Sequence, residues 1–196
     1  MKKNHILFLV AALAIIASCK KDDTNKNNSN GINGTYTFNG MHSTTSSTLT
    51  SDDGEKVVSV ADWTSANNQG TIVFNSGNAT NTNFSYSVNS VSKAYYYEDN
   101  ILVDSMSSPF VVAIPTSNSV STYKLIGTDS IYFPKGGLVA IGTTTSSSNA
   151  GGGHYKMSGN QLTLTLNGII DSTFSDTGVK YNVQQSVVSS IVLIKQ

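Results

Sequence analysis

Apolar and polar residues alternate with a period of two through much of this chain after its first thirty residues. The alternating or β-rich blocks lie at 35–38, 56–60, 71–74, 84–88 and 161–166. Successive side chains of a strand point to opposite faces, so this pattern predicts strands with one buried face. Because no window beyond the N-terminal apolar run keeps a helical period, we expect an all-β domain of about eight to ten antiparallel strands.

Residues typical of turns separate these blocks. Glycine, asparagine and aspartate favour the backbone conformations of tight turns, which predicts hairpin connections between the strands. Residues 61–66 are compatible with one short helical turn. The main turn signals are Asn39-Gly40, Asp53-Gly54, Gln69-Gly70, Ser76-Gly77-Asn78, Gly127-Thr128-Asp129 and Gly159-Asn160.

Two similar blocks, 123–133 and 155–165, each contain Tyr-Lys followed by a glycine and a β-rich stretch. Each block predicts a hairpin, and together they suggest consecutive hairpins of a meander. The final segment, 179–196, predicts a strand that is paired inside the sheet, because an exposed apolar edge invites aggregation. Closing the sheet into a barrel is one way to cover that edge.

The N-terminus has the layout of a secretory signal peptide. Lys2 and Lys3 precede an apolar run of twelve residues, 6–17, which is shorter than the about 20 residues of a membrane-spanning helix. The only cysteine of the chain, Cys19, follows this run after one serine, Ser18. The sequence Ile-Ala-Ser-Cys at 16–19 resembles the bacterial lipobox, which implies cleavage before Cys19 and attachment of acyl chains such as palmitate to it.

The residues after Cys19 are polar and predict a disordered tether. Lys21-Asp22-Asp23 resembles the surface-export signal of Bacteroidetes lipoproteins, which implies a location on the outer membrane, exposed at the cell surface. We therefore divide the chain into a signal peptide at 1–18, a tether at 19–31 and one globular domain at 32–196.

Charge excludes one class of partner. All twelve basic residues are lysines, and the chain contains no arginine. Removal of the signal peptide, with its two lysines, leaves ten lysines against twelve acidic residues, a net charge near −2. A protein without a basic excess or the bidentate arginine side chain is poorly suited to nucleic acid, and we expect none as a partner.

Three blocks make the chain similar to a known family. Gly34-Thr35-Tyr36, the block YKMSGNQLTL at 155–164 and the final IVLIKQ at 191–196 resemble the lipocalin-like lipoproteins of Bacteroidetes. Tyr36 stands where the lipocalin signature has tryptophan. The resemblance implies a single up-and-down antiparallel β-barrel with a cavity.

Few residues suggest catalysis, so we expect no enzyme, metal or cofactor. His42 and His154 are the histidines that remain after processing, and too few other ligands accompany them for a closed zinc site. Both histidines are predicted to lie in exposed loops, and the glycines at 151–153 are predicted to form a flexible hairpin loop. The acidic pairs 52–53 and 98–99 are interpreted as solvated turn residues.

The aromatic residues are the candidate ligand-binding residues. Tyr95 and Tyr97 share one face of a strand, where they could line a pocket or simply contribute to the core, and Trp63 carries the same two alternatives. We expect a monomeric, membrane-anchored protein that binds a small apolar or amphipathic ligand. The alternative is a β-sandwich adhesin or glycan-binding module, which would have two separate sheets.

Overall fold

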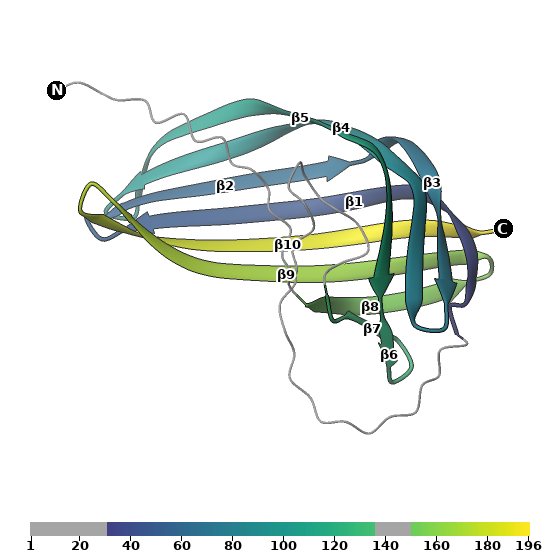
Figure 1. Cartoon of the computed structure of the whole chain (residues 1–196). Coiled ribbons are helices and arrows are strands. Elements are labelled where there is room, and N and C mark those ends of the chain that lie inside the picture. Colours follow the sequence, from purple (N-terminus) through teal and green to yellow (C-terminus); the bar gives the residue numbers. More distant parts are fainter. Residues whose placement is uncertain (1–30, 136–149) are drawn as a thin grey trace.

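The computed structural model describes residues 31–135 and 150–196, and these residues form an all-β, antiparallel structure (Figure 1). The ten strands are β1 (Gly34–Ser51), β2 (Glu55–Thr64), β3 (Ala66–Asn75), β4 (Asn78–Glu98), β5 (Ile101–Thr122), β6 (Lys124–Ile126), β7 (Ser130–Phe133), β8 (Gly151–Ser158), β9 (Gln161–Asp176) and β10 (Val179–Lys195). The predictions of an all-β class and of about eight to ten antiparallel strands are confirmed.

The strands belong to one sheet with the order β2-β4-β3-β1-β10-β9-β8-β7-β6, and β5 pairs with β4. Strands β2 and β3 lie end to end between β1 and β4, since each of them pairs with both. This arrangement alone closes a ring through β1, β2, β4 and β3. The ring is therefore a consequence of one interrupted strand, and the pairing does not establish a barrel.

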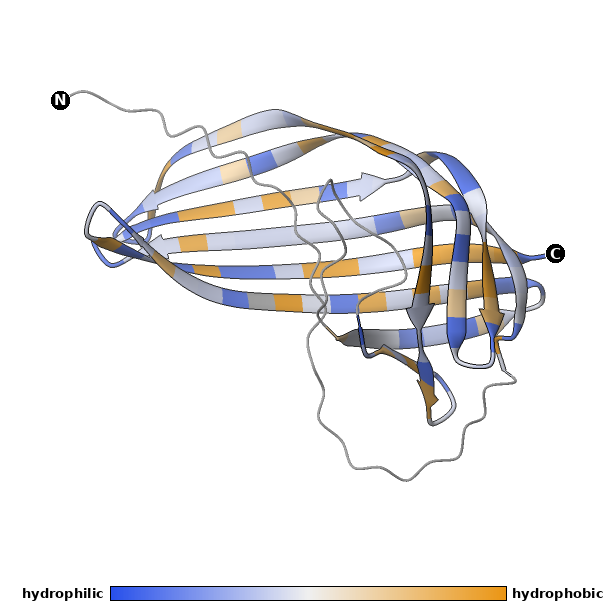
Figure 2. Ribbon diagram, in the orientation of Figure 1, coloured by the Kyte–Doolittle hydropathy of each residue, from blue (hydrophilic) through white to orange (hydrophobic). Residues whose placement is uncertain are grey.

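The sheet has two parts. In the proximal part, β3 and β6–β8 join the ends of the long strands around a hydrophobic core. The long strands then continue past this core as the order β5-β4-β2-β1-β10-β9 (Figure 1). We call this continuation, residues 43–61, 90–111 and 168–187, the distal sheet. Colouring by hydropathy shows apolar and polar residues interleaved along its strands (Figure 2).

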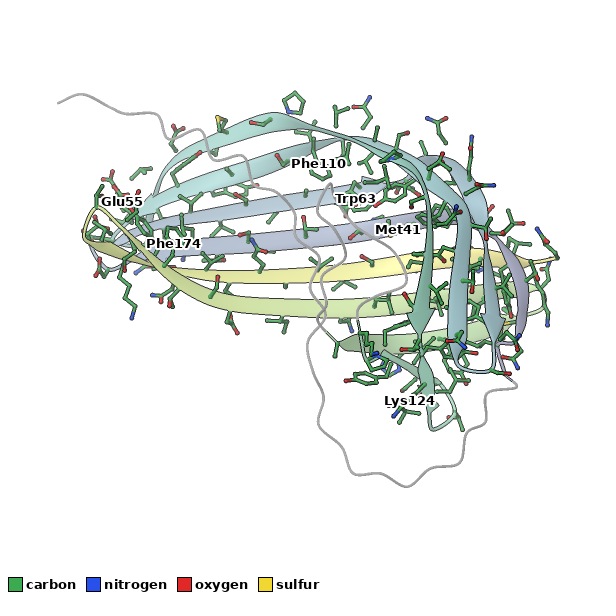
Figure 3. The ribbon with its side chains drawn as sticks, in the orientation of Figure 1. Met41, Glu55, Trp63, Phe110, Lys124 and Phe174 are labelled. Atoms are coloured by element: carbon green, nitrogen blue, oxygen red, sulfur yellow. The ribbon has the colours of Figure 1, made fainter. Side chains whose placement is uncertain are left out.

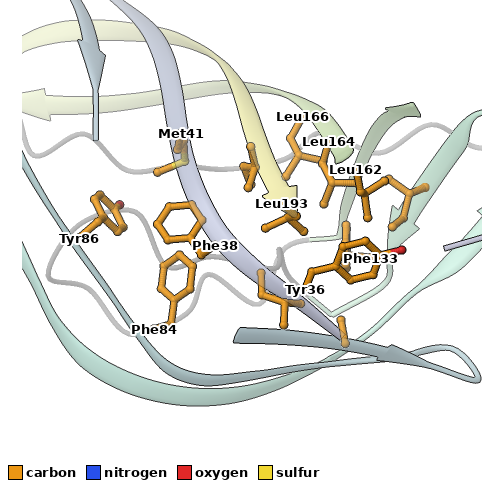
Figure 4. Close-up of a cluster of buried hydrophobic side chains, with 14 of the residues drawn as sticks. Tyr36, Phe38, Met41, Phe84, Tyr86, Phe133, Leu162, Leu164, Leu166 and Leu193 are labelled. Carbon is orange, nitrogen blue, oxygen red and sulfur yellow. The ribbon is translucent and has the colours of Figure 1, made fainter. Parts of the chain in front are cut away.

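The core of the proximal part is rich in aromatic side chains (Figure 4). Phe38 contacts both Phe84 and Tyr86, with ring centroids 4.5 and 6.1 Å away. Tyr36 is fully buried, and its hydroxyl donates a hydrogen bond to the carbonyl oxygen of Ile32 at 3.0 Å. Burial of such large rings supplies a major part of the stability of a small domain.

Most of the expected strands and hairpins are confirmed. All five alternating blocks lie within strands, and the two similar blocks form the consecutive hairpins β6–β7 and β8–β9. Strand β10 pairs with β1 on one side and β9 on the other, as predicted for the final segment.

Two of the predicted turns and the predicted helical turn were wrong. Asn39-Gly40 and Gln69-Gly70 lie inside β1 and β3, where the pairing register shifts as at a β-bulge. Gly70 has φ +107°, and a Cβ there would lie 2.7 Å from the Cα of Phe84. The glycine thus permits a bulge against the neighbouring strand rather than a chain reversal. Residues 61–64 and 66 are strand, not helix.

The prediction of a flexible hairpin loop at the glycines 151–153 was also wrong, because these residues lie in β8. A Cβ on Gly152 would lie 2.5 Å from the carbonyl oxygen of Ile131 in β7, and one on Gly153 would overlap the carbonyl oxygen of Thr165 in β9. These glycines therefore allow three backbones to approach closely.

Alkaline pH is expected to weaken the fold through Tyr86. Burial raises the pKa of Tyr86 well above its ordinary value of 10.0. Above pH 10 the phenol ionises in the unfolded chain but stays protonated in the fold, so its contribution to stability falls as the pH rises. We predict that the free energy of unfolding, measured with urea at pH 8 and pH 10.5, falls less in Tyr86→Phe than in wild type. Equal losses would contradict this assignment.

Candidate functional site

The inner face of the distal sheet continues the face that carries the core. Along β1 and β2, inner residues pair as Thr45 with Ala61 and as Leu49 with Val57. In β10, residues 179–187 alternate regularly between half-buried or buried inner positions and exposed outer positions. Along β10 the inner side of the distal sheet is therefore more buried than the outer side.

Trp63 lies where the core meets the distal sheet (Figure 3). Its side chain is 3% exposed, stacks on Tyr86 at 6.3 Å with an interplanar angle of 8°, and contacts Phe110 at 6.3 Å. Of the two alternatives for this residue, the structure places it with the core residues. An exposed stacking platform for a ligand is thus not what Trp63 provides.

The polar atom of Trp63 is nevertheless unusual. Its indole Nε1 is buried, and no acceptor in the described residues forms a hydrogen bond with it. Leaving a buried donor unpaired costs about 1–3 kcal/mol, so such groups normally have a partner. An acceptor supplied from outside the chain would remove this cost.

Buried hydroxyl groups lie on the same inner face. Ser43, the cross-strand partner of Trp63, and Ser189 of β10 are both buried, and their Oγ atoms lie 2.9 Å apart. The core of the proximal part is apolar, so the inner face changes from apolar to mixed character at this pair. Sequence reasoning missed both residues, since serine is abundant in this chain and gives no signal by itself.

Tyr95 and Tyr97 share one face of β4, as the alternation predicted, but it is the outer face. They pair with Val58 and Lys56 of β2, respectively. Both rings are half-buried, and Lys56 Nζ lies 4.8 Å from the centroid of the Tyr97 ring. The two tyrosines and Trp63 therefore lie on opposite faces of the sheet, and the structure does not bring the three candidate residues together.

The histidines lie in strands, which corrects their predicted loop positions. His42 is in β1, and its Nε2 lies 2.8 Å from Oδ1 of Asp62; His154 is in β8, and its Nδ1 lies 3.5 Å from Oδ2 of Asp129. All four side chains are well exposed. Within the described residues, no three side chains of the metal-ligating types gather at one place.

Three of the four residues of the acidic pairs lie in turns, as predicted, whereas Glu98 is the last residue of β4. Asp52 and Asp53 form the β1–β2 turn, and Asp99 lies in the β4–β5 turn. At the same end of the sheet, partial burial and then the charges of Asp53, Asp176, Glu55 and Asp52 raise the pKa of Tyr181. The hairpin end of the distal sheet is thus negatively charged.

No protein family model, curated protein or solved structure matches this chain. In residues 31–135 and 150–196, no helix has the length and apolar character needed to cross a membrane. Cys19, the signal peptide and most of the tether lie outside the described residues. What the fold defines is an all-β protein with one antiparallel sheet, a packed proximal core and a distal sheet beyond it.

Proposed function

We propose that this chain is a lipid-anchored, non-catalytic lipoprotein of the outer membrane that binds a small amphipathic ligand on the inner face of the distal sheet. The observation that carries the proposal is the buried and unpaired indole N–H of Trp63 at the start of this face. A carbonyl or carboxylate oxygen of the ligand would accept its hydrogen bond. Ligand sites commonly combine apolar walls with a few polar groups that fix orientation.

The inner face beyond Trp63 suits an acyl chain. It is half-buried and mixes aliphatic, aromatic and hydroxyl side chains, which include Leu49, Val57, Ser59, Ser92, Ala94, Tyr96, Phe110 and Val183. Trp63 and Val57 lie six residues apart on one strand, which corresponds to about 20 Å. A ligand with a polar head at Trp63 and an extended tail over Val57 would bury apolar surface along this length.

The order of the strands supports a lipocalin-like assignment as part of the proposal. If β2 and β3 count as one strand, and β5 and β6 as another, the chain makes an eight-stranded up-and-down meander that ends with β10 beside β1. Only Tyr123 separates β5 from β6. This is the connectivity of the barrel to which the three sequence blocks are similar.

The proposed lipid anchor and the proposed cellular location rest on the N-terminal sequence. We propose that Cys19 carries the acyl chains, that 19–31 forms the tether, and that Lys21-Asp22-Asp23 directs export to the cell surface. The alternative adhesin or glycan-binding module has less support, because it would have two separate sheets and the described strands belong to one.

The ligand proposal is tested with the fluorescence of Trp63, the only tryptophan of the chain. We expect saturable quenching or a spectral shift when palmitate is added to the chain from Lys20 onward, which lacks the anchor. Val57→Glu places a charge on the inner face and should weaken binding by about tenfold or more, since a buried unpaired charge is costly.

Val58→Glu is the matched control, because Val58 is the next residue of β2, is also half-buried and points to the outer face. It should leave palmitate binding close to wild type. A linear, non-saturating response of wild type, or equal losses in the two variants, would contradict binding on the inner face.

A further inference from the structure

The outer face of the distal sheet is chemically divided. Across β1 it presents hydroxyl groups, those of Thr44, Ser46 and Thr48. Across β2, β4 and β5 it is largely apolar and aromatic. We call this second area the outer patch, and it comprises Lys56, Val58, Val60, Val91, Lys93, Tyr95, Tyr97, Leu102, Pro109 and Val111.

The outer patch exposes more apolar surface than a scatter of single residues would. Val91, Leu102 and Val111 are 52%, 53% and 68% exposed. Val91 is the cross-strand partner of Pro109, and Tyr97 is that of Leu102. The pairs of Lys93 with Ser107 and of Tyr95 with Ser105 lie between them, so apolar residues meet across β4 and β5 at both ends of the patch. A contiguous exposed apolar area commonly marks a surface that contacts a membrane or another protein.

The polar groups of the outer patch are of the kind found at a membrane interface. Lys56 and Lys93 are its only charged residues, and Lys56 lies over the ring of Tyr97. Asp62 borders the patch and is paired with His42. Tyrosine and lysine have apolar bodies and polar ends, which lets them sit between lipid tails and headgroups. Two lysines without a carboxylate among them also complement anionic headgroups.

We infer that the outer patch rests on the lipid bilayer that holds the anchor, so that the distal sheet lies along the membrane. This inference rests on the proposed lipid anchor. The 13 residues of 19–31 can reach at most about 45 Å, which allows the domain to lie on its side. Stable attachment usually combines two membrane signals, and the patch would supply one in addition to acylation.

This orientation of the distal sheet also sets the side from which the ligand site is reached. Neighbouring residues of a strand face opposite sides, so the inner face turns away from the bilayer when the outer patch lies on it. Val57 and Trp63 would then face the space outside the membrane. The ligand would enter from that side and not from the lipid phase.

The experiment is amine footprinting of the full lipidated chain on vesicles of phosphatidylcholine with a minority of phosphatidylglycerol, using a membrane-impermeant reagent and mass spectrometry. Lys156 and Lys180 lie outside the outer patch and serve as internal references. We expect Lys56 and Lys93 to react about fivefold more slowly in wild type than in the double variant Val91→Glu/Val111→Glu, in which added charge lifts the patch from the lipid. The reference lysines should react equally in both proteins.

Val188→Glu is the matched control, because Val188 is 48% exposed on the outer side of β10 and lies outside the patch. It should leave the protection of Lys56 and Lys93 as in wild type. Equal reactivity of these lysines in wild type and the double variant, on vesicles with which both proteins float, would overturn the orientation while leaving the anchor intact. A lipidated wild type that does not float with vesicles would overturn the anchor and the orientation together.

Discussion

The substitution Gly153→Ala is expected to lower the free energy of unfolding by about 1–3 kcal/mol. This is a large share of the total, because small domains are stable by only about 5–15 kcal/mol. The added Cβ would overlap the carbonyl oxygen of Thr165 and approach the Cα of Leu166 to 2.9 Å. Both are backbone atoms of the paired strand β9, so neither can move without breaking the ladder. The free energy of unfolding, measured with urea, reports this loss.

Gly31→Ala provides the control for this substitution. A Cβ at Gly31 would have its nearest neighbour, the hydroxyl oxygen of Tyr155, at 3.6 Å, which is ordinary van der Waals contact. Its stability should stay within about 0.5 kcal/mol of wild type, as for most surface changes. If Gly153→Ala were equally well tolerated, the close approach of β8 to β9 would not be a feature of the folded protein.

The glycine positions show what local patterns do and do not predict. Gly159-Asn160 forms the predicted turn between β8 and β9, because the alternating blocks on both sides can pair only if the chain reverses there. Gln69-Gly70 carries a similar signal but lies in a bulge. Glycine allows both a positive φ, as at Gly159, and a close approach of two backbones, as at Gly153. Which of the two applies depends on the strand that lies beside it. That neighbour is set by the tertiary fold.

The candidate site shows the same limit. The alternation correctly placed Tyr95 and Tyr97 on one face of a strand, because side-chain direction follows from strand geometry alone. It did not tell which face is buried, since that depends on how the sheet curves around its core. Trp63, with an identical prior interpretation, lies on the opposite face. Only the three-dimensional structure shows that the indole nitrogen of Trp63 is buried without a hydrogen-bond partner among the described residues.

Strand length also explains why the sheet has a proximal and a distal part. The strands β4, β5 and β9 have 21, 22 and 16 residues, whereas β6, β7 and β8 have 3, 4 and 8 residues. The long strands must therefore extend beyond the part that the short ones cover. Sequence blocks of four to six residues predicted the strands but not these lengths, because Ser- and Thr-rich stretches continue a strand without adding an apolar signal.

The substitution Cys19→Ser is expected to abolish acylation and to remove the chain from the outer-membrane fraction. Each acyl CH₂ contributes about 0.8 kcal/mol to membrane binding, and a hydroxyl cannot take the place of the thiol in the thioether. Intact mass of the purified wild type should correspond to a chain that begins at Cys19 and carries acyl groups. The variant should have no acyl mass and should keep residues 1–18 or be cleaved elsewhere.

Ser18→Ala is the control for the anchor, because it changes the neighbouring residue and keeps it small. It should be processed and acylated like wild type, and both should stay with membranes in high salt, which screens charge but not lipid insertion. The outer patch alone supplies a weaker attachment, and the part of it that comes from Lys56 and Lys93 should fall as salt is added. Firm, salt-resistant attachment of Cys19→Ser to the outer membrane would show that the chain is held there by something other than a lipid on this sulfur.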